Sequence, residues 1–334
     1  MSEATTIGDP VLPEAQMHLV LPTEPVTGRL VESYICTKGK SNSVVRHVSI
    51  DIAGTPLAGN FLVGQSFGCI PPGADSFGKP HKVRLYSIAS PSWGEDGKGN
   101  VLSTTVKRVM EEFKPQTPKD DQEAHHLFLG VCSNYMCDIK VGTEMKISGP
   151  NGKRFLLPTS PNDHDFIFIA TGTGIAPFRG MVMELLKNPA GLCTSQIHFL
   201  MGSPYTTDLM YDDLFRQLEK EHSNFRYHVA ISRESSSKIG LECRGEYVDR
   251  CFDRLMSTIA PLLKSPRGLI YICGLAGMQV GLFKALAKHG GRAVHDAQAR
   301  NRFHRSGPMD GGADQAAHSP HAAVHARGVL GRLN

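Results

Sequence analysis

Apolar runs alternate with amphipathic stretches in the second half of the chain, whereas the first half is built of short segments of alternating polarity. In the second half the pattern predicts strands at 166–170, 196–202, 225–231 and 269–273. A helix is predicted after each strand, at 175–187, 207–221, 247–257 and 276–288. Strands that alternate with helices are typical of a doubly wound parallel sheet.

The first half predicts a different architecture. Its alternating segments lie at 44–52, 83–88, 101–106, 127–131 and 145–148. Turns rich in Gly and Pro separate them, for example at 71–73 and 149–152. Short strands joined by such turns indicate an antiparallel β-barrel or sandwich. We therefore predict a two-domain β + α/β protein, with a β-barrel domain at 27–160 and an α/β domain at 161–289.

The two ends of the chain do not follow these patterns. Residues 1–26 are rich in Pro, Glu and Thr and lack a charged and then apolar leader, which indicates a flexible arm and not a secretory signal. Residues 290–334 are rich in Ala, Gly, Arg and His, and no helical or strand period is visible there. We expect an atypical, disordered tail, and hence a parallel sheet whose last strand is missing.

Composition narrows the function classes. The chain has 334 residues and a formal net charge of +4, which is too weak for a nucleic-acid surface but compatible with an acidic protein partner. No apolar run is long enough to predict stable membrane insertion. Among the eight cysteines, Cys132 and Cys137 have the opening spacing of a plant-type iron–sulfur site, but Lys140 replaces the third ligand. We expect reduced thiols, no metal site, a cytoplasmic location and a monomer.

The strand segment Arg84-Leu85-Tyr86-Ser87 places an aromatic hydroxyl beside a cation. The Tyr86 ring can cover one face of a flavin, and the Arg84 guanidinium can bind a pyrophosphate oxygen. Ser87 points to the opposite face of the strand from Tyr86, because side chains alternate along a strand. An Arg and a Tyr two positions apart can equally be an ordinary solvent-facing pair.

Two turns offer backbone N–H groups to phosphates. Gly130-Val131-Cys132-Ser133 ends an apolar strand and opens a short helix, where N–H groups and the Ser133 hydroxyl can form an anion site. A strand-end turn with a capping serine is the simpler alternative. Thr171-Gly172-Thr173-Gly174 lies between a strand and a helix N-terminus, where a dinucleotide phosphate can approach the backbone.

The ends of two later strands carry further candidates. Ser232 and Arg233 end the third strand of the second half, and a hydroxyl with a guanidinium there suits a ribose 2′-phosphate, which favours NADP over NAD. An Arg in a solvated loop is the alternative. The fourth strand ends in Cys273-Gly274, and this thiol would by itself be a buried structural cysteine.

Taken in order, these segments resemble the plant-type ferredoxin–NADP reductase family from Gly64 to about Lys288. The resemblance is carried by 64–66, 70–73, 78–82, 84–87, 105–108, 130–134, 171–178, 232–234 and 271–278. It implies a flavoprotein oxidoreductase for electron transfer, with FAD in the first domain and NADP in the second. Such an enzyme exchanges a hydride with NADP(H) and single electrons with ferredoxin or flavodoxin.

The resemblance also implies residue roles. Ser87 and Cys273 would be catalytic, beside the reacting atoms of the two cofactors. The residues that would bind the cofactors are Arg84, Leu85, Tyr86, Ser87, Lys107, Val131, Cys132, Ser133, Thr173, Ser232, Arg233 and Tyr247. The basic residues that suit an acidic ferredoxin are Arg29, Lys38, Lys40, Lys79, Lys82, Lys153 and Arg154.

The chain departs from the family at two places. The family has a Lys two residues before the tyrosine that corresponds to Tyr247, and here position 245 is Gly. The family also ends in a strand with an acidic residue and a terminal aromatic that covers the flavin, whereas this chain ends in Leu333-Asn334. Two alternatives therefore stay open: a reductase component of an oxygenase system, and a C-terminally damaged, weakly active flavoprotein.

Overall fold

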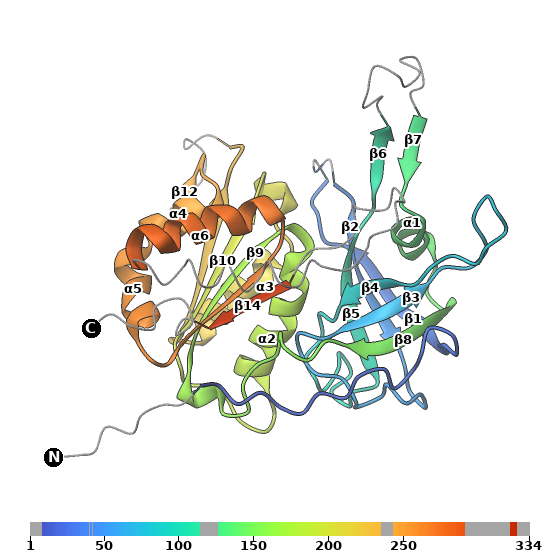
Figure 1. Ribbon diagram of the computed structural model, residues 1–334, viewed down its shortest axis with the longest axis horizontal. Helices are drawn as coiled ribbons and strands as arrows, with labels where there is room; N and C mark the ends of the chain where they lie inside the picture. The colour runs from blue at the N-terminus through green and yellow to red at the C-terminus, as the bar shows by residue number, and fades with distance from the viewer. Residues whose placement is uncertain are drawn as a thin grey trace.

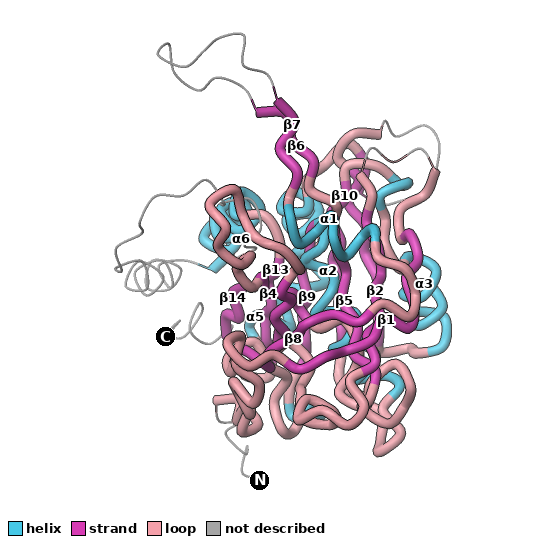
Figure 2. Tube along the Cα trace, turned by 90° about the vertical axis from the view of Figure 1, so that its right-hand side faces the viewer, coloured by secondary structure: helices cyan, strands magenta, loops and turns pink. Residues whose placement is uncertain are grey.

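The computed structural model describes residues 9–39, 41, 43–113, 126–234, 243–290 and 321–325. Two sheets form two lobes that lie side by side (Figure 1). The first lobe is antiparallel, and the second is a parallel sheet with helices on both faces (Figures 1 and 2). The predicted two-domain β + α/β class is confirmed.

The antiparallel sheet has six strands in the order β4-β3-β8-β1-β2-β5. Their bounds are β1 (Val26–Ile35), β2 (Val45–Asp51), β3 (Ser66–Ile70), β4 (Arg84–Ser87), β5 (Val101–Lys107) and β8 (Glu144–Asn151). Helix α1 (Val131–Asp138) buries Met136 and Cys137 in the core of this sheet. A separate hairpin of β6 (Met110–Phe113) and β7 (His126–Leu129) projects from this lobe (Figure 1).

The second sheet has the order β12-β11-β10-β9-β13-β14. Its strands are β9 (Asp165–Thr171), β10 (Ile197–Ser203), β11 (Phe225–Ile231), β12 (Cys243–Arg244), β13 (Gly268–Cys273) and β14 (His321–His325). The strands from β12 to β13 are parallel, and β14 is antiparallel to β13. The carboxyl ends of β9, β11 and β13 therefore lie at one edge.

Helices pack on this sheet according to the alternation of its strand residues. Phe166 and Phe168 share a core with α2 (Ile175–Lys187) and α3 (Asp212–Glu221) on one face. Ile167 and Ile169 share a core with α4 (Val248–Arg254), α5 (Met256–Lys264) and α6 (Ala276–Gly290) on the other. Three short 3-10 turns complete the lobe: η1 (Pro161–Asp163), η2 (Gly172–Gly174) and η3 (Thr206–Asp208). None of the described helices combines the length and the apolar character that crossing a membrane requires.

The two lobes pack directly on each other. Val45 and Phe155 join the core of the second lobe. In the first lobe, the His18 N–H donates to the carbonyl of Pro150 at 2.9 Å, so the described part of the N-terminal arm lies against β8. Helix α2 lies directly against the first lobe at Gly180, where a Cβ atom would be 2.5 Å from the carbonyl oxygen of Ser90.

The first sheet differs from the predicted barrel at its two edges. Within the described residues, no ladder joins β4 to β5. Single hydrogen bonds connect them instead: the Thr104 hydroxyl donates to the carbonyl of Ser87 at 2.7 Å, and the Ala89 N–H donates to the carbonyl of Ser103 at 2.7 Å. The edges therefore meet through isolated contacts, and the strands remain a sheet with two ends.

Two further expectations differ from the structure. Sequence patterning predicted no last strand beside β13, but β14 pairs with it, with Cys273 opposite His321. The rest of the predicted tail lies outside the described residues. All cysteines were expected to be reduced, but Cys251 is disulfide-bonded, whereas six others, including Cys273, form no disulfide.

The contact at Gly180 gives a stability test. An alanine in the middle of a helix normally stabilises it, but here the added methyl group meets a backbone oxygen that cannot move alone. We expect Gly180→Ala to lower the free energy of unfolding by about 1–3 kcal/mol, the usual cost of overpacking. The matched control is Gly277→Ala in α6, where nothing lies within 4 Å of the added atom. Urea denaturation of both variants checks this, and equal stability of the two would contradict it.

Candidate functional site

The predicted flavin segment is strand β4, which lies at the edge of the first sheet. Its register places Arg84 opposite Cys69 on β3. The Cys132 thiol at the start of α1 donates to the carbonyl of Cys69 at 3.8 Å, so α1 is packed against this pair of strands. Tyr86 is half-buried there, and burial raises the pKa of its hydroxyl far above the usual value. The structure thus brings together Arg84 and Tyr86 of β4 with Cys132 of α1.

The N-terminus of α1 carries uncapped backbone donors. Its N-cap, Gly130, makes no side-chain capping bond, and its first turn contains no acidic residue. The Ser133 hydroxyl donates to the carbonyl of Gly130 at 3.1 Å and accepts the N–H of Val109 at 3.2 Å. This hydroxyl is therefore occupied within the protein, and the backbone N–H groups at the start of the helix are the groups suited to an anion.

The glycine turn η2 lies against the end of β13. A Cβ atom on Gly174 would be 2.3 Å from the carbonyl oxygen of Cys273. Gly274 has a φ of +153°, and a Cβ there would be 2.3 Å from the Thr171 hydroxyl oxygen, which accepts the N–H of Leu275 at 3.2 Å. Both positions require glycine. The sequence-predicted Thr173 and Cys273 are consequently neighbours at the carboxyl edge of the sheet.

Cys273 is buried, with 1% of its surface exposed. Burial raises the pKa of its thiol to about 12, because a thiolate there would lose its hydration. The side chain is therefore a neutral thiol at physiological pH, and it can fill space and exclude water but not act as a nucleophile.

A third group of predicted residues lies at the end of β11. Arg233 is exposed, and its N–H donates to the carbonyl of Pro204 at 2.9 Å. The N–H of Gly245 donates to the carbonyl of Ile231 at 2.8 Å, which brings the segment before α4 alongside Ser232. Tyr247 is the N-cap of α4 and is 69% exposed. A planar aromatic ring and a guanidinium thus stand at the same edge, open to solvent.

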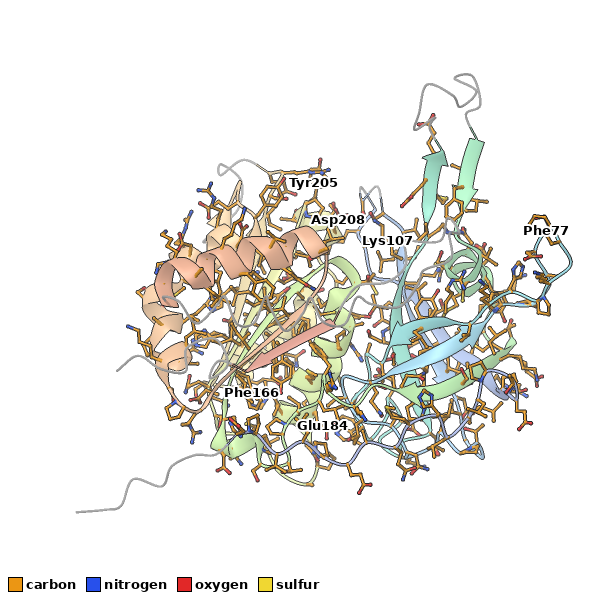
Figure 3. The ribbon with its side chains drawn as sticks, viewed as in Figure 1. Phe77, Lys107, Phe166, Glu184, Tyr205 and Asp208 are labelled. Carbon is orange, nitrogen blue, oxygen red and sulfur yellow. The ribbon has the colours of Figure 1, made fainter. Side chains whose placement is uncertain are left out.

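Strand β5 connects the groups. It packs against η2, and its Thr104 hydroxyl donates to the carbonyl of Ser87. Ser87 of the first lobe and Thr173 of the second therefore share one neighbour. Lys107, at the end of β5, is exposed near the boundary of the lobes (Figure 3).

Sequence reasoning missed the polar contacts that join the lobes. Arg179 on α2 donates through both terminal nitrogens to the carboxylate of Glu95. Tyr211, before α3, bonds side chains of the first lobe. One sequence feature could have indicated this contact: Arg179 is a charged residue between Phe178 and Gly180 in an otherwise apolar stretch. In the structure, the first two turns of this helix are buried.

Comparison with known proteins also indicates an oxidoreductase that binds a nicotinamide dinucleotide. Residues 168–282 match the family model described as an oxidoreductase NAD-binding domain. The chain is 36% identical over 292 residues to a ferredoxin–NADP reductase of Picosynechococcus sp., covering 84% of this chain and 67% of the relative. The chain belongs to the ferredoxin–NADP reductase family. A Spirulina relative of the same name is 34% identical and is covered to 90% of its length.

Other family members extend the comparison. A chloroplastic root isozyme from Arabidopsis thaliana is 36% identical over 277 residues, with 81% of this chain and 69% of that protein covered. The chain thus spans about two thirds of the length of several of these relatives, 65% in one from Synechocystis. The solved ferredoxin–NADP+ reductase of Plasmodium falciparum has the same fold, with a TM-score of 0.64, 23% identity, and 86% and 97% of the two chains covered.

The buried thiol gives a direct chemical test. Because burial raises the pKa of Cys273 to about 12, only about one thiol in ten thousand is ionised at pH 8. We expect iodoacetamide to leave Cys273 unmodified in the native protein and to label it fully in urea. Peptide mass mapping measures the labelling, with Cys273→Ala to assign the peptide. Rapid labelling of the native protein would show that the thiol is accessible and ionised.

Proposed function

We propose that this protein is an FAD-dependent ferredoxin–NADP oxidoreductase. The observation that carries the proposal is the meeting of two phosphate-binding elements across β5: the start of α1 beside β4, and the turn η2 beside Cys273. One suits a flavin nucleotide and the other a nicotinamide dinucleotide, and their reactive ends would face each other at the boundary of the lobes. Family membership supports the choice of FAD and NADP(H).

The first lobe would hold FAD. The backbone N–H groups of Val131 and Cys132 at the uncapped start of α1 suit the pyrophosphate, and the Arg84 guanidinium adds a charge-assisted contact. Tyr86 would lie against one flavin face, with Leu85 and Ser87 beside it on β4. Lys107 provides a further cation at the end of β5. The Ser133 hydroxyl would act indirectly, by fixing the turn before α1.

The second lobe would hold NADP(H). At Gly172 nothing lies within 4 Å of the position of a Cβ atom, so a phosphate could approach the backbone of η2 there, with Thr173 next to it on the turn. Arg233 and Ser232 would bind the 2′-phosphate, and Tyr247 would stack on the adenine. Position 245, where the family has a lysine, is a glycine whose N–H donates to the carbonyl of Ile231, so this position would add no cation to the 2′-phosphate.

When bound, FAD supplies the chemistry that links a two-electron hydride donor to one-electron acceptors. The protein supplies orientation and exclusion of water. Ser87 would orient the nicotinamide by a hydrogen bond, and the neutral Cys273 thiol would pack beside the reacting carbon without competing for the hydride.

The electron partner would be a ferredoxin or flavodoxin. An acidic partner suits the cations Lys38, Lys79, Lys82 and Lys153, whereas Arg29 is already paired with Glu144 at 3.4 Å. Lys40 lies outside the described residues. The monomeric state and the cytoplasmic location stay predictions. Ferredoxin-dependent reduction of cytochrome c by NADPH tests the proposed function, and NADPH oxidation that reaches only an oxygenase partner would contradict it.

Replacement of Arg84 tests the FAD site. A hydrogen bond to a charged group is worth about 1.5–3 kcal/mol, so Arg84→Ala should weaken FAD binding by about tenfold to a hundredfold. The dissociation constant is measured by flavin fluorescence on titration of the apoprotein. Arg29→Ala, at an exposed ion pair of the same lobe, is the matched control and should bind FAD like the wild type. An unchanged constant in Arg84→Ala would remove this residue from the site.

Replacement of Arg233 tests coenzyme choice. Only the 2′-phosphate distinguishes the coenzymes, so Arg233→Ala should lower kcat/KM for NADPH by about tenfold to a hundredfold and leave NADH unchanged. Arg226→Ala is the control, since Arg226 lies near the start of β11, whereas Arg233 follows the end of that strand. Equal losses for NADPH and NADH would mean that Arg233 has a structural role.

A further inference from the structure

A buried ion pair lies where α2 meets the first lobe. Arg179 is 8% exposed, and its two terminal nitrogens bind both carboxylate oxygens of Glu95. One of these nitrogens also donates to the carbonyl of Ala89 at 2.9 Å. Burial alone would raise the pKa of Glu95, but the Arg179 guanidinium outweighs it and holds the pKa below its usual value. Both groups are therefore charged at neutral pH, and the planar fork fixes their mutual orientation.

Tyr211, directly before α3, contacts the same arginine. It has a φ of +56°, a conformation that costs a non-glycine residue about 1–3 kcal/mol. Its ring lies under the Arg179 guanidinium, with 5.2 Å between the ring centre and the guanidinium carbon. Its hydroxyl bonds His47 Nδ1 at 2.9 Å and the Thr105 hydroxyl at 2.7 Å. The strained backbone thus places a hydroxyl across the boundary between the lobes.

A second attachment of α2 lies one turn further along. The Ser92 N–H and hydroxyl donate to the carboxylate of Glu184, at 2.8 and 2.9 Å. Figure 3 shows Glu184 at the boundary of the two lobes. Gly180, between the two attachments, allows backbone contact with Ser90. Helix α2 is therefore held at Arg179, Gly180 and Glu184 by a single segment, 89–95.

This segment and this helix are the direct continuations of the two candidate cofactor elements. Segment 89–95 follows β4, which ends at Ser87, and α2 follows η2, which ends at Gly174. Arg179 lies five residues beyond Gly174, or about 7.5 Å along the helix axis. A displacement of α2 would move η2 relative to β4 by a similar amount.

Burial of an ion pair is a weak way to gain stability, because the loss of hydration offsets the attraction. An apolar pair of the same size would hold the lobes together equally well. The two hydrogen bonds from the Arg179 guanidinium to Glu95 also fix an orientation. They set both the distance and the rotation of α2 relative to the first lobe. Hydride transfer depends on such placement, since a misplacement of about 1 Å can reduce the rate a hundredfold.

We propose that Arg179, oriented by Glu95 and Tyr211, is a positioning residue for hydride transfer, which holds the nicotinamide loop η2 in register with strand β4. The proposal rests on the proposed function. It assigns Arg179 no contact with substrate: the residue acts through the helix that carries the loop.

Two variants remove different parts of this contact. Arg179→Lys keeps the charge and loses the fork, and Tyr211→Phe keeps the ring and loses only the hydroxyl that reaches His47 and Thr105. The matched control is Arg267→Lys, which alters the ion pair with Asp165 inside the second lobe, away from η2. If Arg179→Lys fails to fold, Tyr211→Phe still tests the proposal.

Two readouts are compared. With ferricyanide as acceptor, both variants should lose about tenfold or more in kcat for NADPH, with KM and FAD content unchanged. In the apoprotein, amide hydrogen exchange of residues 171–180 should accelerate by about tenfold, while β9 and β10 exchange as in the wild type. Arg267→Lys should change neither. Wild-type kcat in both variants, or unchanged exchange at 171–180, overturns the proposal.

The same variants and measurements distinguish a failure of this inference from a failure of the proposed function. If the wild-type protein binds no FAD or oxidises no NADPH, the proposed function fails, and the hydrogen exchange of the apoprotein then reports only on the contact between the lobes. If the wild-type protein is active and the variants match it, only the positioning role of Arg179 fails.

Discussion

The lack of a side chain at position 180 lets helix α2 lie directly against the backbone of the first lobe. The distance from the missing Cβ to the carbonyl oxygen of Ser90 would be 2.5 Å, so even a methyl group would force the lobes apart. Polar attachments on either side of this contact determine how the helix is turned. Because η2 leads directly into this helix, the shape of the candidate site depends on an interaction outside it.

The candidate site relies on backbone groups more than on charged side chains. Helix α1 begins without a capping side chain, and η2 lies so close to β13 that two glycines are required. The Ser133 hydroxyl beside α1 is taken up by backbone groups of the protein itself. Rigid backbone N–H groups can bind a phosphate at little cost in side-chain entropy.

Local patterns predicted the second lobe well. Strand β11 and helix α2 have the predicted bounds, because their apolar periods are strong and glycine or polar turns end them. Strand β1 was missed because it carries Arg29 and Glu32 and is largely exposed, and β3 because Gly68 interrupts a short run. The candidate cofactor segments could be named from the sequence because each is a continuous motif. The pair of Glu95 and Arg179 was not, because 84 positions separate them and only the tertiary packing brings them together.

The order of the parallel strands has its own consequence. From β9 the chain moves outwards to β10, β11 and β12, and then returns to the other side of β9 to form β13. The helices that follow β9 and β13 consequently leave the sheet towards opposite faces, α2 to one and α6 to the other. In open parallel α/β sheets, the place where two neighbouring connections diverge in this way is where ligands usually bind. The place proposed for the dinucleotide is thus set by the order in which the chain forms its strands, and a mutation can alter what binds there without moving the place.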